Sequence, residues 1–171
     1  MKKFPKALAF VFFLSLHCSY EEKRFREAVE LEKQGKEMLA LYEYEKLIKS
    51  SPSFLPAYKR AGILFSKSTE SLGVSTNYLL KVWNEGKDKE TLAYLFSNSL
   101  ETKDFSSAAN YLEEAKNSNL DLYPTMEKIY FCSTKTTKID LVVQELDKSP
   151  TQIFQKALEN CKKKLVSGPP K

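Results

Sequence analysis

The chain has 171 residues, of which 42% are apolar and 29% charged, and its formal net charge is +5. This composition excludes a disordered chain and indicates an ordinary globular protein. Residues 1–17 contribute three lysines and no acids, so the formal charge of residues 18–171 is +2. This positive excess is too small for binding to a nucleic-acid backbone.

The first 17 residues differ from the rest of the chain. Lys2, Lys3 and Lys6 form a basic start, and Ala7–Leu16 is apolar apart from Ser15. A run of this length is too short to cross a bilayer core of about 30 Å as a helix. It has the form of the hydrophobic part of a secretion signal, so residues 1–17 are predicted to be a signal peptide.

The segment that ends this run, residues 14–18, reads Leu-Ser-Leu-His-Cys and resembles the lipobox of bacterial lipoproteins. The resemblance implies cleavage before Cys18, attachment of lipid (palmitate) to Cys18, and a tether over residues 18–24. His17 departs from the family pattern, which has a small residue there; relaxed lipoboxes of the spirochete type tolerate such changes. Secretion without lipid and retention as an uncleaved anchor stay open as alternatives.

Apolar residues recur at helical spacing from Glu21 to about Leu165 and predict paired helices. In chain order the pairs are two helices within residues 27–50, then Pro56–Phe65 with Val74–Trp83, then Lys89–Leu100 with Phe105–Lys116. A weaker fourth pair begins near Tyr123 and continues with Ile139–Leu146 after a loop at Cys132–Thr137. Thr151–Leu165 is predicted to be a last amphipathic helix, and residues 166–171 a disordered tail.

The pairs repeat with a period of 34 residues, which indicates one supersecondary unit stacked along the chain. The aligned sets are Ala40, Val74 and Ala108; Tyr44, Tyr78 and Leu112; and Ala28, Gly62 and Phe96. Gly62 is expected to mark a close helix crossing, because glycine otherwise costs about 1 kcal/mol inside a helix. A generic helical bundle with a chance period is the alternative.

Residues 104–108 (Asp-Phe-Ser-Ser-Ala) and 56–65 resemble the second and first helices of a tetratricopeptide repeat (TPR). Phe96 departs from the pattern, which has a small residue at this place. The resemblance implies an all-α fold over residues 25–165: a right-handed α-solenoid of helix-turn-helix TPR-like repeats with a C-terminal capping helix. In this family the first helix of each unit lines a groove that binds a peptide or a partner helix. The positions carried over by register are Phe25, Val29, Lys59, Ile63, Ser66, Lys67, Ala93, Ser97 and Glu101.

The cysteines and glycines do not form the motif of a metal site, a phosphate-binding loop or a catalytic site. Cys132 and Cys161 either form a disulfide, as an exported chain permits, or pack as two buried thiols. Neither a CxxC motif nor a second histidine accompanies them, so no metal site is expected, and no cofactor. The five scattered glycines form no phosphate-binding loop, and the only histidine is His17. We therefore expect no enzyme.

The expected function is a protein-protein interaction module, an adaptor or assembly factor anchored by lipid in the bacterial cell envelope. Its partner is a protein or peptide rather than a nucleic acid. Ile63 stands where the family's carboxylate-binding clamp needs an asparagine, so a C-terminal carboxylate is not the expected ligand. Two alternatives stay open: a surface-exposed lipoprotein that binds host or environmental molecules, and a regulatory subunit of an envelope enzyme.

Overall fold

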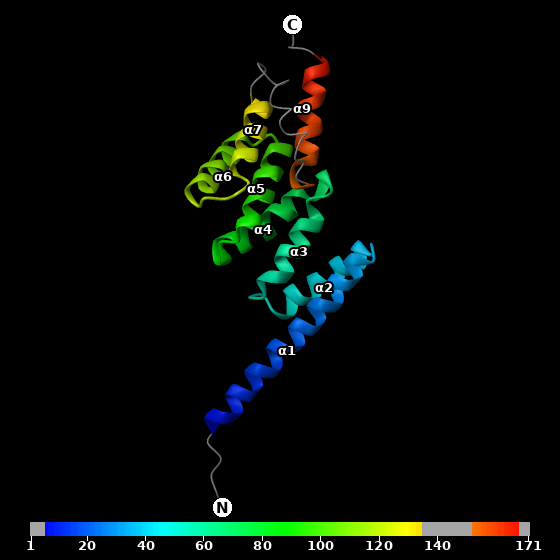
Figure 1. The fold of residues 1–171 in the computed structure, drawn as a ribbon. Coiled ribbons are helices and arrows are strands. Elements are labelled where there is room, and N and C mark those ends of the chain that lie inside the picture. Colours follow the sequence, from blue (N-terminus) through cyan, green and yellow to red (C-terminus); the bar gives the residue numbers. More distant parts are fainter. Residues whose placement is uncertain (1–5, 135–151, 168–171) are drawn as a thin grey trace, which may run out of the picture.

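The computed structural model describes the backbone of residues 6–134 and 152–167, and side chains within residues 20–134 and 153–163. These residues form eight α-helices and two short 3-10 helices, and consecutive helices pack as antiparallel pairs (Figure 1). The all-α class is therefore confirmed. In chain order the elements are α1 (Lys6–Lys33), α2 (Glu37–Ser50), α3 (Leu55–Phe65), η1 (Thr69–Ser71), α4 (Leu72–Gly86), α5 (Lys89–Glu101), α6 (Phe105–Asn117), α7 (Tyr123–Thr134), η2 (Gln152–Phe154) and α9 (Gln155–Ser167).

Local chemistry sets several of the helix ends. Asp88 and Asp104 cap α5 and α6, since their carboxylates accept hydrogen bonds from the backbone N–H groups of Thr91 and Ser107. Pro56 lies in the first turn of α3, where its missing N–H leaves no intrahelical bond unmade. Lys87 ends α4 in the left-handed conformation.

The odd-numbered helices keep the 34-residue interval. Helices α3, α5 and α7 begin at Leu55, Lys89 and Tyr123. The even-numbered helices α2, α4 and α6 begin at Glu37, Leu72 and Phe105, so α4 comes one residue late. This shift follows the 3-10 turn η1. Val74, which aligns with the buried Ala40 and Ala108, is 42% exposed, and Ser75 takes the buried place in α4.

Two apolar clusters run through the stack. The N-terminal cluster joins α1, α2 and α3 through Ala28, Ala40, Tyr44, Leu47, Ala57, Ala61 and Leu64. The C-terminal cluster extends from Ile63 in α3 to Cys161 in α9, with α5 at its centre. Nine of the thirteen residues of α5 are buried, so α5 is the central helix of the molecule.

Other expected boundaries differ from the structure. Helix α1 continues through residues 18–24, which the sequence assigned to a tether, and Arg24 forms an ion pair with Glu43 of α2. Helix α7 includes Cys132–Thr134, so the loop predicted there begins too early. Residues 139–146, the predicted second helix of the fourth unit, lie outside the described residues. Helix α9 also includes residues 166 and 167 of the predicted tail.

Candidate functional site

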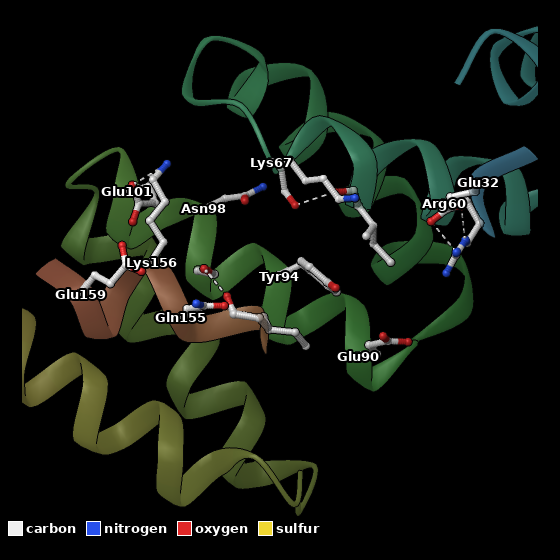
Figure 2. A pocket seen from close by; sticks show the side chains of 14 residues that line it. Glu32, Arg60, Lys67, Glu90, Tyr94, Asn98, Glu101, Gln155, Lys156 and Glu159 are labelled. Atoms are coloured by element: carbon white, nitrogen blue, oxygen red, sulfur yellow. Dashed lines mark hydrogen bonds and ion pairs between the residues drawn. The ribbon is translucent and has the colours of Figure 1, made fainter. Parts of the chain in front are cut away.

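A groove of about 710 Å³ runs between α3 and α9 over the surface of α5 (Figure 2). Its lining comes from the odd-numbered helices α1, α3 and α5 and from the C-terminal segment η2–α9. The lining residues are Glu32; Arg60, Ile63, Ser66 and Lys67; Glu90, Tyr94, Ser97, Asn98 and Glu101; and Ile153, Gln155, Lys156 and Glu159. We refer to this cavity as the groove.

Helical spacing explains how each wall forms. On α5, the positions 90, 94, 97 and 101 recur at intervals of three and four residues, so their side chains share one face of the helix. On α3, the positions 60 and 63 do the same, and Ser66 and Lys67 extend this wall just beyond the end of the helix. The two helices therefore each present a single stripe to the groove.

A buried polar chain fixes the floor of the groove beneath these stripes. Asn98, only 3% exposed, donates from Nδ2 to Ser75 Oγ at 2.8 Å and to Thr76 Oγ1 at 3.3 Å. Ser75 Oγ in turn donates to the carbonyl oxygen of Gly62 at 2.8 Å. These bonds connect α5, α4 and α3, and a satisfied buried network of this kind favours one relative arrangement of its helices.

The wall nearest the N-terminus holds a bidentate ion pair. Arg60 donates to both carboxylate oxygens of Glu32, at 2.6 and 3.0 Å, and the Tyr44 hydroxyl donates to Glu32 at 3.0 Å. Burial raises the pKa of Tyr44 to about 12, and the neighbouring Glu32 carboxylate adds to this effect. Burial alone would lower the pKa of Arg60, but its hydrogen bonds to Glu32 outweigh burial and raise it. The guanidinium therefore stays charged and holds α1, α2 and α3 together.

The opposite end of the groove is closed by a second ion pair. Glu101 of α5 accepts from Lys156 Nζ at 3.1 Å and from Asn160 Nδ2 at 3.2 Å, both on α9. Figure 2 shows Tyr94, Asn98 and Gln155 in the space between this pair and the Glu32–Arg60 pair. The whole lining has four glutamates against one arginine and two lysines, so it is close to neutral and lacks the cationic excess that a phosphate backbone requires.

Five of the nine groove positions expected from the sequence line the groove: Ile63, Ser66, Lys67, Ser97 and Glu101. The other four do not, and each has a partner within the chain. The Phe25 ring packs against Tyr44 and Phe54, at centroid distances of 5.7 and 5.5 Å, and Val29 packs on the N-terminal cluster. Ala93 is fully buried in the C-terminal cluster, where it has no surface to offer a partner.

Lys59 is the fourth expected position that lies elsewhere. Its Nζ lies 2.8 Å from both Asp88 and Glu90, so it connects α3 to the start of α5 instead of facing the groove. Burial would lower the pKa of Lys59, but hydrogen bonds to these two carboxylates outweigh burial and raise it. Lys59 is therefore a bridge between helices.

The residues of α1, α3 and α5 that line the groove without having been expected from the sequence are Glu32, Arg60, Glu90, Tyr94 and Asn98, and those of η2 and α9 were not expected either. Tyr94 lies three residues before Ser97 and shares its stripe with Glu101, so helical spacing was the signal that pointed to it. No local pattern placed α9 at the groove, because its position depends on contacts with residues more than 50 places earlier in the chain.

Comparison of this chain with known proteins finds no match to a protein-family model, a curated protein or a solved structure. Within the described residues, no group of three or more His, Cys, Asp or Glu side chains is placed to hold a metal ion. None of the helices in this part of the chain combines the length and apolar character that a bilayer crossing requires.

The two cysteines of the C-terminal half form a disulfide. Cys132 in the last turns of α7 and Cys161 in α9 are bonded, with their Cα atoms 5.9 Å apart, and both side chains are buried. Of the two outcomes that the sequence left open, the structure has the bonded one. The side chain of Cys18, the expected lipid-attachment residue, lies outside the described side chains.

Proposed function

We propose that this chain is a non-enzymatic adaptor of the bacterial cell envelope, a TPR-like lipoprotein that binds a polypeptide segment of a protein partner in the groove. The observation that carries the proposal is which helices supply the residues that line the groove. Three successive odd-numbered helices, α1, α3 and α5, contribute to one cavity, as the first helices of stacked units would.

The spacing of the elements supports the repeat. Helices α3, α5 and α7 begin at 34-residue intervals, and the aligned residues Ala28, Gly62 and Phe96 are all buried. Gly62 lies at a close contact with α4, which is the place where a tetratricopeptide unit has a small residue. Phe96, the departure from the family pattern, packs edge-on against Phe154 of η2 at 5.9 Å.

The chemistry of the groove suits a polypeptide. The exposed side-chain amide of Gln155 has donor and acceptor atoms, which match the N–H and C=O groups of an extended backbone. Ile63 and Ile153 supply apolar contact, and the charged groups of both signs at the walls would set the register of the bound segment. A volume of about 710 Å³ is adequate for a few residues of such a segment.

The proposed location rests on the N-terminal segment and on the disulfide. A basic start, a short apolar run and Cys18 have the order of a lipoprotein signal. Disulfides persist outside the reducing cytosol, so the Cys132–Cys161 bond agrees with an exported chain.

Site-specific photo-crosslinking in cells tests the binding site. A photoreactive residue at Gln155, which is exposed in the groove, is expected to give one defined protein adduct, and the same residue at Lys116, exposed on α6, is not. Lys67→Glu should reduce the Gln155 adduct at least fivefold, whereas the matched reversal Lys116→Glu should leave it unchanged. Equal adducts from both positions, or no adduct from Gln155, would contradict binding in the groove.

Metabolic labelling with palmitate, together with intact mass, tests the anchor. Label is expected on the wild-type chain and on Cys161→Ala, and is expected to be absent from Cys18→Ala. If the wild-type chain carries no label, the intact mass distinguishes a cleaved secreted protein from an uncleaved one, and the lipoprotein assignment is wrong in either case.

A further inference from the structure

The C-terminal segment η2–α9 lies on the part of the groove surface where the third unit would meet a partner. Ser97, a groove position expected from the sequence, donates from Oγ to the carbonyl oxygen of Ile153 at 3.2 Å. Glu101, the next expected position, accepts from Lys156 and Asn160. Ser97 and Glu101 are positions of α5 at which the repeat pattern predicts contact with a partner. Here both contact the chain's own C-terminal segment.

Segment η2–α9 is held there in the way that a groove holds an amphipathic helix. Phe154, 2% exposed, inserts its ring edge-on against Phe96 of α5. Leu158 and Cys161 follow at four and seven residues, so the buried side chains form one stripe. Lys156 and Asn160 flank the stripe and reach Glu101. Apolar anchors at intervals of three, four and seven residues are the pattern by which an amphipathic helix binds in an apolar groove.

One covalent bond fastens this segment to the body of the protein. The disulfide joins Cys161, midway along α9, to Cys132 of α7. The bond adds a covalent link to the noncovalent contacts that α9 makes with α5 and α7. A crosslink at the centre of the contact restrains opening of α9.

We infer that η2–α9 is an intramolecular ligand of the surface formed by α5 and α7, retained by the Cys132–Cys161 disulfide, and that this surface, once vacated, binds an amphipathic helix of the same pattern. The pattern is an aromatic residue followed two and six positions later by a basic and an amide residue. Release is a two-electron reduction in which a dithiol reductant becomes a disulfide and Cys132 and Cys161 become thiols. The inference rests on the proposed function only in treating the groove as a binding surface.

Hydrogen exchange of the full chain tests the release. On reduction with dithiothreitol, amides in α9 are expected to exchange at least tenfold faster, while amides of α2, which belongs to the N-terminal cluster, keep their rates. The variant Cys132→Ala/Cys161→Ala should behave like the reduced chain without reductant. Unchanged protection of α9 would overturn the inference. So would simultaneous loss of protection in α9 and α2, because α9 would then be an inseparable part of one cooperative core.

Binding in trans tests the recognition pattern and needs no natural partner. The host is the full chain with Cys161→Ala and Phe154→Ala, which weaken its own α9 so that it does not compete at high local concentration. A fluorescent peptide of residues 152–167 with Cys161→Ser is expected to bind this host, and the oxidised wild-type chain is expected not to bind it. The same peptide with Phe154→Ala should bind at least tenfold more weakly.

A charge exchange completes the test. A Lys156→Glu peptide should lose affinity for the host and recover it on a host that also carries Glu101→Lys. If the peptide does not bind, or if Phe154→Ala leaves its affinity unchanged, the surface of α5 and α7 does not recognise this segment. These outcomes are independent of the crosslinking experiment: absence of a natural partner would not alter peptide binding, and failure of the peptide would not alter a crosslink at Gln155.

Discussion

Gly62 in α3 lies directly against Leu79 in α4: a Cβ atom added to Gly62 would come within 2.8 Å of Leu79 Cγ and 3.4 Å of the carbonyl oxygen of Ser75. The same glycine supplies the carbonyl that accepts the hydrogen bond from Ser75 Oγ. Gly62, which has no side chain, is therefore both a point of close contact between α3 and α4 and a member of the buried hydrogen-bond network under the groove.

We predict that Gly62→Ala destabilises the protein despite the better helix propensity of alanine. Propensity alone would stabilise by about 1 kcal/mol, whereas overpacking of an interior contact costs about 1–3 kcal/mol. The net loss in the free energy of unfolding is expected to be about 1 kcal/mol, measured by urea denaturation.

Gly73 provides the matched control for this change. It lies in the first turn of α4, and a Cβ there would meet no atom within 4 Å. Gly73→Ala is therefore expected to leave the protein as stable as before or to stabilise it by up to about 1 kcal/mol. If both glycines respond alike, the close approach at Gly62 has no energetic consequence and its explanation by packing is wrong.

The helices could be predicted from sequence because their signals are local. The apolar spacing within α5, the caps Asp88 and Asp104 and the proline at the start of α3 all act within a few residues. The start of α4 one residue late could not be predicted, because it depends on how the chain turns through η1. The alignment of Val74 with Ala40 and Ala108 gives no reason to expect Ser75 at the buried position instead.

The groove was predictable only on the side that the repeat itself forms. Ile63, Lys67 and Glu101 follow from helical register, but the place of Lys59 depends on whether a carboxylate of the next unit lies near it. Likewise, amphipathicity predicts that α9 packs on something without saying on what. Its position at Ser97 and Glu101 follows from shape and charge complementarity between segments far apart in sequence.

Loss of the Glu32–Arg60 pair is expected to destabilise the N-terminal wall of the groove. Arg60→Met leaves the carboxylate of Glu32, whose side chain is 14% exposed, without its bidentate donor, and we expect a loss of about 1–3 kcal/mol. Arg60→Lys should recover only part of this, since an ammonium group does not bind both oxygens in one plane.

The exposed ion pair between Lys67 and Glu37 is the control for Arg60, because it also connects the α3 region, two residues after the helix ends, to the first helical pair. Lys67→Met is expected to change the free energy of unfolding by less than about 0.5 kcal/mol, as solvent screens this pair. Thermal or urea unfolding of the three variants measures the difference. A loss for Lys67→Met as large as that for Arg60→Met would contradict the role given to burial.

Alkaline pH should destabilise the fold partly through Tyr44. Its pKa is about 12 in the folded protein, against an ordinary value of 10.0, so between these values the folded state keeps a proton that the unfolded state has lost. Because the unfolded state then binds fewer protons, stability falls as pH rises, by about 2–3 kcal/mol over the whole interval.

The variant Tyr44→Phe isolates this contribution. At neutral pH it should be less stable by about 1 kcal/mol, because the hydrogen bond to Glu32 is lost. From pH 10 upwards its stability should decline less steeply than that of the wild-type chain. Other tyrosines with raised pKa values, such as Tyr94 and Tyr111, remain in both proteins and cancel in the comparison. Parallel curves would show that Tyr44 does not hold its proton as its surroundings indicate.

Acid pH should act through Asp88, where a helix cap and an ion pair coincide. Asp88 accepts hydrogen bonds from the Thr91 N–H at 2.9 Å and from Lys59 Nζ at 2.8 Å. Burial would raise the pKa of Asp88, but these donors outweigh burial and lower it. The unfolded state therefore takes up a proton first, and the stabilisation, fully present above the ordinary pKa of about 4, is lost as pH falls through the lower folded value.

Two substitutions separate the cap from the charge at this position. Asp88→Asn retains an oxygen that accepts from Thr91, so at neutral pH it should be more stable than Asp88→Ala, which we expect to lose about 1–2 kcal/mol. Below pH 5 the wild-type chain should lose stability more steeply than Asp88→Asn, because only the carboxylate titrates.

Asp104, which caps α6 in the same way but is exposed, serves as the comparison: Asp104→Ala should cost less than Asp88→Ala. Guanidinium unfolding at pH 7, 5 and 3 measures all three variants, and an acid dependence that survives in Asp88→Asn would assign it to other carboxylates.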